Sequence, residues 1–152
     1  MNKKRILIIT SCLLLIIVAY ITYSFISTAR TKNHIRNTSV SFINIWANFS
    51  DRYSEDYLVS IKPFLSDSLT KQYQEDVTTV GQVNKNFGIK PTAAVFKDIS
   101  VISIKKSGNE YQVRLSGKLK YSFENNFTNK IAFIRFKKDN RSWLVQEVYF
   151  ED

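Results

Sequence analysis

The sequence is poor in the residue types that most often carry catalysis or bind metals. Its 152 residues include one cysteine, Cys12, and one histidine, His34. A single cysteine excludes a disulfide within the chain, and no cysteine–histidine cluster has the spacing of a zinc site. Acid–base catalysis by His34 would need a nucleophile and an orienting acid held against it, whereas its polar, basic surroundings are typical of a solvated side chain. The sequence predicts no catalytic residue, no metal ligand and no cofactor.

Glycine and proline are also scarce, with four and two residues. The glycines are scattered singly, so no glycine-rich loop of the kind that holds phosphate groups is present. The chain instead contains 8 Tyr, 11 Phe and 2 Trp, and aromatic side chains bury the most apolar surface per residue. This composition favours a packed domain over a disordered tail.

Acidic residues are in the minority, with 13 Asp and Glu against 22 Lys and Arg. Even without Lys3, Lys4 and Arg5, the basic groups of the remaining chain outnumber the acidic ones by six. A surplus of this size beside a membrane is explained by attraction to anionic lipid headgroups or cell-wall polymers.

One long stretch lacks charge altogether, the 24 residues from Ile6 to Ala29. A helix rises about 1.5 Å per residue, so about 20 such residues cross the roughly 30 Å hydrocarbon layer of a bilayer. The stretch exceeds the roughly 7–15 apolar residues of a cleaved signal peptide, which favours an uncleaved anchor. Two alternatives are cleavage after the small residues 27–29 and a lipoprotein signal ending at Cys12, which too few apolar residues precede.

The anchor predicts how the chain is divided into segments and how it is oriented in the membrane. We expect a cytoplasmic tail at 1–5, a transmembrane anchor at 6–28, a helical juxtamembrane stretch at 29–38 and an α+β domain at 39–152. Basic residues flank both ends of the anchor almost equally. A short basic tail followed at once by an apolar helix resembles a signal-anchor, so we expect a single-pass protein with a cytoplasmic N-terminus and an extracytoplasmic domain.

The first part of the domain has helical periodicity. Apolar residues from Val40 to Phe49 recur every three or four positions, which predicts an amphipathic helix. Ser54 is a candidate N-cap for a short helix that Pro63 interrupts, and Ser66 or Asp67 can begin a third helix. We expect a loop over 84–92, which contains a glycine and a proline.

The second part of the domain has the alternation of strands. We expect strands at 94–105, 111–124, 128–138 and 142–150. The second is unusually long, so we expect it to bend at Gly117. The apolar run 131–134 predicts burial on both faces of the third strand. In the fourth, simple alternation puts Trp143 and Val145 on one face, and Leu144, Val148 and Phe150 on the other.

Helices followed by an antiparallel meander indicate an α+β fold with the helices on one side of a bent four-stranded sheet. The element order resembles the nuclear transport factor two-like (NTF2-like) fold over about residues 40–152, through helical residues at Trp46, Tyr53, Tyr57, Leu69 and Tyr73 and the strand Trp143–Val145. The resemblance implies a cone in which a curved sheet wraps around a long first helix. Membrane-anchored proteins with such a domain include scaffold subunits of type IV secretion and conjugation machines and the mycobacterial-entry-associated proteins.

The resemblance also implies a pocket at the open end of the cone. Its possible lining is Trp46, Tyr53, Tyr57, Tyr121, Phe133 and Trp143. An ordinary aromatic core explains these residues better. No histidine is available to complete the acid–base dyads of the family's enzymes.

A basic face is the other candidate site. The predicted docking face consists of Arg114, Lys118, Lys120, Lys137 and Lys138. The alternative is a solvated sheet whose lysines prevent edge-to-edge pairing. Nucleic acid is a disfavoured partner, because lysine, serine and glutamine alternate on this strand where stacking aromatics would be needed.

Three functions follow as hypotheses. The first is a non-catalytic, membrane-tethered scaffold of a bacterial envelope complex, with envelope proteins or further copies of the chain as partners. The second is a small-ligand-binding or enzymatic domain that uses the aromatic cavity. The third is a sensor that binds anionic lipid or wall polymer through the basic face.

Overall fold

The computed structural model describes residues 3–140 and 142–151 of the chain. It divides into two compact units, Met1–His34 and Ile35–Asp152. Of the predicted divisions, residues 1–2 of the tail and residues 141 and 152 of the domain lie outside the described residues.

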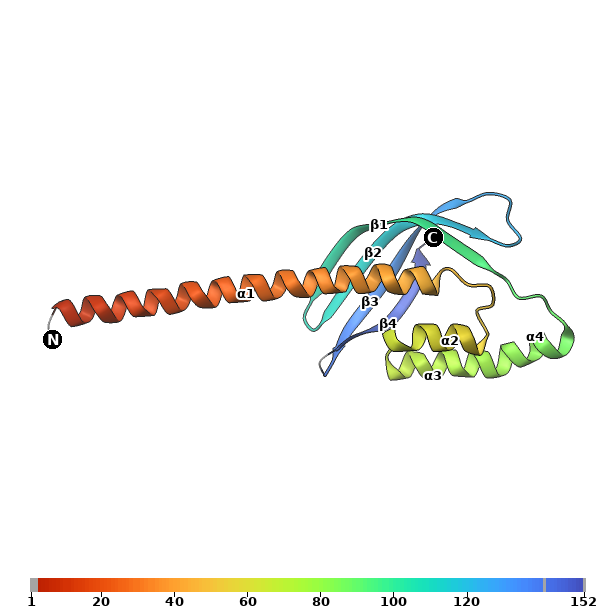
Figure 1. Ribbon diagram of the computed structural model, residues 1–152, viewed down its shortest axis with the longest axis horizontal. Coiled ribbons are helices and arrows are strands. Elements are labelled where there is room, and N and C mark those ends of the chain that lie inside the picture. The colour runs from red at the N-terminus through yellow and green to blue at the C-terminus, as the bar shows by residue number, and fades with distance from the viewer. Residues whose placement is uncertain (1–2, 141, 152) are drawn as a thin grey trace. The chain divides into compact units, whose positions relative to one another are not determined.

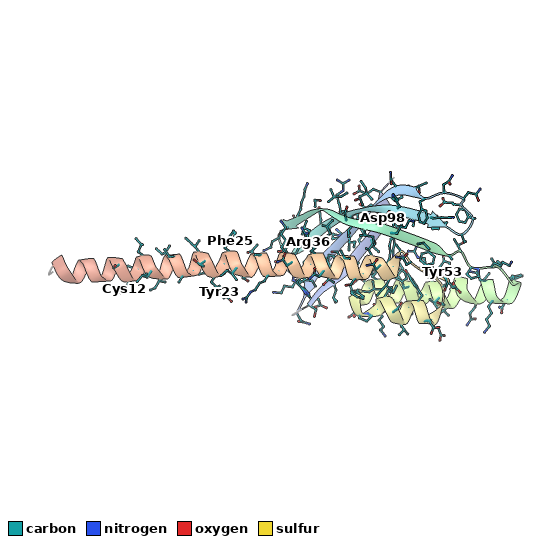
Figure 2. All side chains as sticks on the ribbon, turned by 45° about the horizontal axis from the view of Figure 1, so that its top comes forward. Cys12, Tyr23, Phe25, Arg36, Tyr53 and Asp98 are labelled. Atoms are coloured by element: carbon teal, nitrogen blue, oxygen red, sulfur yellow. The ribbon has the colours of Figure 1, made fainter. Side chains whose placement is uncertain are left out.

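The first unit is helical, formed by the N-terminal part of α1 (Lys3–Trp46). The helix from Ser11 onward contains a segment of mean hydropathy 2.0, none of it buried in the protein, and it is long and apolar enough to cross a membrane. Cys12, Tyr23 and Phe25 project from this bare helix (Figure 2). The Thr22 hydroxyl donates to the Val18 carbonyl at 2.8 Å, so it has a partner inside the helix, as lipid requires.

The second unit begins with the end of α1, which buries Ile35, Phe42, Ile43 and Trp46. After it come α2 (Glu55–Ile61), the 3₁₀ turn η1 (Lys62–Phe64) and α3 (Asp67–Asp76). Ser54 caps α2 by accepting a bond from the Tyr57 N–H at 3.2 Å. Ser66 caps α3 in the same way.

The predicted loop at 84–92 is wrong for its first part. A π-helical turn, η2 (Val77–Gly81), and α4 (Gln82–Phe87) continue the helix until Gly88, which has φ 63°. Val77, Val80, Val83 and Phe87 recur every three or four positions, which is the period of a helix, although most side chains here are exposed. The Thr78 and Thr79 hydroxyls donate to carbonyls four residues back, at 2.8 and 2.7 Å.

The sheet confirms the predicted α+β class. Four antiparallel strands follow in the order β1 (Ala94–Ser107), β2 (Glu110–Tyr121), β3 (Thr128–Asp139) and β4 (Ser142–Glu151). The helices cover one face of this sheet (Figure 1). We call that face inner and the other outer. On β2, Tyr111, Val113, Leu115, Gly117 and Leu119 point inward and are buried.

One prediction about β2 is wrong. The strand ends at Tyr121 instead of continuing to residue 124. Its register with β3 is regular through Gly117, and an irregularity of β1 lies opposite Gly117, at Asp98, which has φ 56°. Gly117 has another role: the Phe96 ring lies where a Cβ atom at this position would be.

The predicted faces of β4 are also partly wrong. Arg135 pairs with Glu147 and Phe136 with Val145, which leaves Gln146 as an extra residue, a β-bulge. The bulge shifts the alternation by one position, so Val148 and Phe150 return to the inner face with Val145. On β3, Ala132, Ile134 and Phe136 are fully buried, whereas residues 131 and 133 are half-buried, so the predicted burial on both faces is only partial.

Candidate functional site

The outer face of the sheet carries most of the predicted docking residues. Arg114, Lys118 and Lys120 alternate with the buried residues of β2. Lys137 shares the outer face, because its cross-strand partner is Glu110. Lys138 comes one position later and therefore points the other way.

Two of these cations have carboxylate partners. The Arg114 guanidinium donates twice to the Glu151 carboxylate, with Nε 2.9 Å from Oε1. Lys118 Nζ lies 3.0 Å from Asp98 Oδ2. This hydrogen bond and the charge of the ammonium hold the pKa of Asp98 below its usual value. Figure 2 shows Asp98 on the sheet. Within residues 3–140 and 142–151, the outer face is therefore a mixture of ion pairs and cations without a carboxylate partner.

Aromatic side chains accompany the cations. Phe133 stacks on Tyr149 of β4, with ring centroids 5.0 Å apart, and it pairs with Arg114 across the strands. Lys97 Nζ lies 4.0 Å from the Phe127 ring centroid and Lys120 Nζ lies 5.8 Å from it. These are cation–π contacts at the opposite end of β2 from Lys137.

The six predicted cavity residues do not surround one space. Trp46 and Tyr57 are in contact in the core, where the Tyr57 hydroxyl donates to the Trp46 carbonyl at 2.9 Å. Burial raises the pKa of Tyr57. Trp143 packs on Tyr111, with ring centroids 4.9 Å apart, and Tyr121 packs on Phe123, with ring centroids 5.4 Å apart. These two pairs lie in other parts of the domain. Phe133 lies on the outer face, and Tyr53 borders the cleft described next.

A cleft of about 550 Å³ lies between the helical layer and β4. Its helical wall consists of Arg52, Tyr53, Leu69, Gln72, Tyr73 and Asp76, and its sheet wall of Arg135, Gln146, Glu147, Val148 and Tyr149. Only Tyr53 among these belongs to the predicted lining. The sequence could not reveal the others, because the bulge and the position of α3 against β4 bring them together.

Arg52 is held in this cleft by aromatic rings. Its guanidinium carbon lies 5.0 Å from the Trp46 ring centroid and 5.9 Å from that of Tyr73. Its Nη2 donates to the Tyr73 hydroxyl oxygen at 3.2 Å, and Trp46 Nε1 donates to the same oxygen at 2.6 Å. Three ion pairs occur among residues 3–140 and 142–151, and none involves Arg52. Arg52 is therefore a half-buried cation, and no carboxylate of the described residues forms an ion pair with it.

Arg135 contributes a second guanidinium to the cleft. Its Nη2 lies 3.0 Å from Glu147 Oε2, whereas its buried Nε has no hydrogen-bond partner. A buried donor without a partner costs about 1–3 kcal/mol. The cleft therefore contains one guanidinium paired with a carboxylate, that of Arg135, and one held by aromatic rings, that of Arg52.

Other hollows lie elsewhere on the surface. One of about 730 Å³ lies between residues 51–55 and α4, and one of about 360 Å³ lies beside Phe127. Among residues 3–140 and 142–151, no three His, Cys, Asp or Glu residues come close enough to hold a metal ion.

No protein-family model and no curated protein matches the sequence. Among solved structures, the chain is similar to the Ntf2-like potential transfer protein TraM of the Gram-positive conjugative plasmid pIP501, with TM-score 0.55, 13% identity, and coverage of 81% of this chain and 95% of that one. It is also similar to the intermembrane space region of the chloroplast protein ARC6, with TM-score 0.56, 13% identity, and coverage of 78% and 95%. At such identities the likeness concerns the fold alone. The second unit of this chain has an NTF2-like fold.

Proposed function

We propose that this chain is a non-catalytic, membrane-tethered interaction module of a bacterial envelope complex, such as a secretion or conjugation apparatus. The observation that supports the proposal is that one chain contains two features. One is a helix long and apolar enough to cross a membrane, and the other is a domain with the fold of a potential transfer protein of a conjugative plasmid.

In this proposal the helix crosses the membrane once, with the N-terminus in the cytoplasm. The domain is extracytoplasmic and uses its surfaces to contact other envelope proteins or further copies of the chain. Confinement to a membrane raises the effective concentration of partners in the same membrane, so weak individual contacts can hold an assembly together.

The topology is tested by labelling cysteines with a membrane-impermeant maleimide in intact cells. Starting from Cys12→Ser, Lys105→Cys in the exposed end of β1 should be labelled without permeabilisation, and Lys3→Cys only after it. The reverse pattern would refute the proposed orientation.

The interaction itself is tested by cross-linking lysines in native membranes with the whole chain present. We expect defined adducts with envelope proteins or with a second copy. If the chain gives only uncross-linked monomer at a reagent concentration that cross-links a known envelope complex, the proposal is wrong.

The basic outer face supports a second candidate, binding to anionic lipid or wall polymer. Lys97 and Lys120 lie against Phe127 and none of the three ion pairs found in the described residues includes them. Binding of this kind weakens as salt rises. Lys120→Glu should then reduce sedimentation of the detergent-free chain with anionic vesicles or teichoic polymers, while Lys71→Glu on α3 should leave it unchanged.

A further inference from the structure

The two edges of the sheet are protected to different degrees. The edge strand β1 carries three exposed lysines, Lys97, Lys105 and Lys106, and its pairing with β2 is irregular at two places. Lysines and bulges are the usual means by which an edge strand avoids pairing with another chain. The other edge strand, β4, contains no lysine and no proline and has a single bulge. β4 is therefore the edge that is open to a further strand.

The edge of β4 that points away from β3 is paired with another segment only near the start of the strand. Leu65 forms a parallel bridge with Val145, and the Ser66 N–H donates to the Val145 carbonyl at 2.9 Å. For Gln146 to Glu151, the strand pairing found within the described residues is with β3 alone. An edge strand leaves every second N–H and C=O pointing away from its neighbour. Beyond the contact with Ser66, β4 therefore presents a row of backbone N–H and C=O groups that point away from β3.

The cleft of about 550 Å³ lies along this free edge. Its sheet wall contains the consecutive residues 146–149, and at about 3.3 Å per residue they provide about 13 Å of edge. α3 forms the opposite wall through Leu69, Gln72 and Tyr73. The space is bounded by backbone groups on one side and side chains on the other, which is the environment of an added strand.

The charges of the cleft favour one kind of strand. Arg135 already has a carboxylate partner in Glu147, whereas Arg52 has none among the described residues. Asp76 lies at the end of α3 and would repel a carboxylate placed beside it. An acidic side chain in the cleft is therefore stabilised in the registers that bring it to Arg52 and destabilised in those that bring it to Asp76.

We propose that this cleft binds an extended, acidic segment of a partner protein, which adds to β4 as a fifth strand and places a carboxylate against Arg52. The proposal rests on the proposed function and assigns the contact to one edge of the domain. Backbone hydrogen bonds to β4 supply the affinity, and the Arg52 charge selects the partner.

The test uses the full chain in detergent micelles and a synthetic probe, the acetylated and amidated peptide Thr-Val-Glu-Val-Thr-Val with a fluorescent label. Binding is measured by fluorescence anisotropy up to about 1 mM, the concentration at which about 4 kcal/mol of binding free energy is still detected. One control peptide has Lys in place of Glu, and the other is N-methylated at alternate residues, which removes the N–H groups that pair with a sheet edge.

The expected order of affinity is Glu peptide, then Lys peptide, then N-methylated peptide. A hydrogen bond to a charged group contributes about 1.5–3 kcal/mol, so the Glu peptide should bind at least about tenfold more tightly than the Lys peptide. Hydrogen exchange of the amides in residues 146–151 should slow when the Glu peptide binds.

Variants at Gln72 keep the test independent of folding, because this side chain is exposed and lines the cleft. Gln72→Lys should tighten binding of the Glu peptide, and Gln72→Glu should weaken it. Arg52→Gln should weaken it by about tenfold, whereas Lys71→Gln, the same loss of charge at an exposed site of α3 outside the cleft, should not change it.

Three results would each overturn the proposal: no binding of the Glu peptide at about 1 mM, equal binding of the Glu and N-methylated peptides, or no response to either Gln72 variant. The failure of this proposal differs from failure of the proposed function. If Gln72→Glu abolishes peptide binding but leaves every cross-link of the chain in native membranes unchanged, the interaction function stands and its assignment to this cleft is wrong.

Discussion

The contact between Gly117 and Phe96 gives the sharpest test of the packing of the sheet. A Cβ atom at position 117 would lie 2.7 and 2.8 Å from Cε2 and Cε1 of the Phe96 ring and would also overlap its Cζ. Glycine in a strand is otherwise less favourable than alanine by about 0.5–1 kcal/mol. Gly117→Ala should therefore stabilise the domain if Phe96 lay elsewhere, and destabilise it if the ring is where the structure places it.

The magnitude follows from these two opposing effects. Forcing an extra carbon into a packed core costs about 1–3 kcal/mol. After subtraction of the gain from removing glycine, Gly117→Ala should lower the free energy of unfolding by up to about 2.5 kcal/mol. In the background of Phe96→Leu, whose side chain lacks the distant ring atoms, the same substitution should be neutral or slightly stabilising.

Denaturant unfolding of the full chain in detergent measures this double-mutant cycle. Both tryptophans, Trp46 and Trp143, lie after residue 34, so their fluorescence reports on the second unit alone. The coupling energy between positions 96 and 117 should be about 1–3 kcal/mol. A stabilising Gly117→Ala, or an equal loss of stability in both backgrounds, would refute the packing described.

Three further predictions concern single side chains. Ser66→Ala removes the cap of α3 and should lower the unfolding free energy by about 1 kcal/mol, measured as above; an unchanged denaturation midpoint would contradict the capping role. Tyr57→Phe leaves the buried Trp46 carbonyl without its side-chain donor and should cost about 1 kcal/mol, with Tyr20→Phe as the matched control in the first unit. The pKa of Asp98 is lowered by Lys118, so the contribution of this pair to stability is present above the unfolded-state pKa of Asp98 and is lost as the pH falls through its lower folded-state pKa. An NMR titration should find the folded value below the usual one in the unsubstituted chain and not in Lys118→Ala.

The strands were predictable because their information is local. The alternation of Tyr111, Val113 and Leu115 with polar residues is complete within β2 and needs no partner to be recognised. Ser54 and Ser66 are equally local signals, since a cap bonds to an N–H of the turn that follows it. The class and order of the elements, and hence the NTF2-like resemblance, followed from such signals.

The faces of β4 and the cleft could not be predicted in this way. The bulge at Gln146 arises from the pairing of β4 with β3, and the residue types of β4 do not predict it. Arg52 and Arg135 are more than eighty positions apart in the sequence and line one cleft only because α3 lies beside β4. Helix α4 was missed for another reason, since the helical spacing of Val80, Val83 and Phe87 continues past Gly81 and up to Gly88.

The position of Phe150 has a consequence for the order in which the domain can be assembled. Its ring lies 5.2 Å from that of Trp46 at the end of α1 and 5.2 Å from that of Phe96 in β1. About a hundred residues of chain separate Trp46 from Phe150. During synthesis the apolar face at the end of α1 is therefore made long before the strand that covers it. Until β4 is made, that face lacks the strand that covers it, and the partly made domain is a substrate for chaperones and proteases.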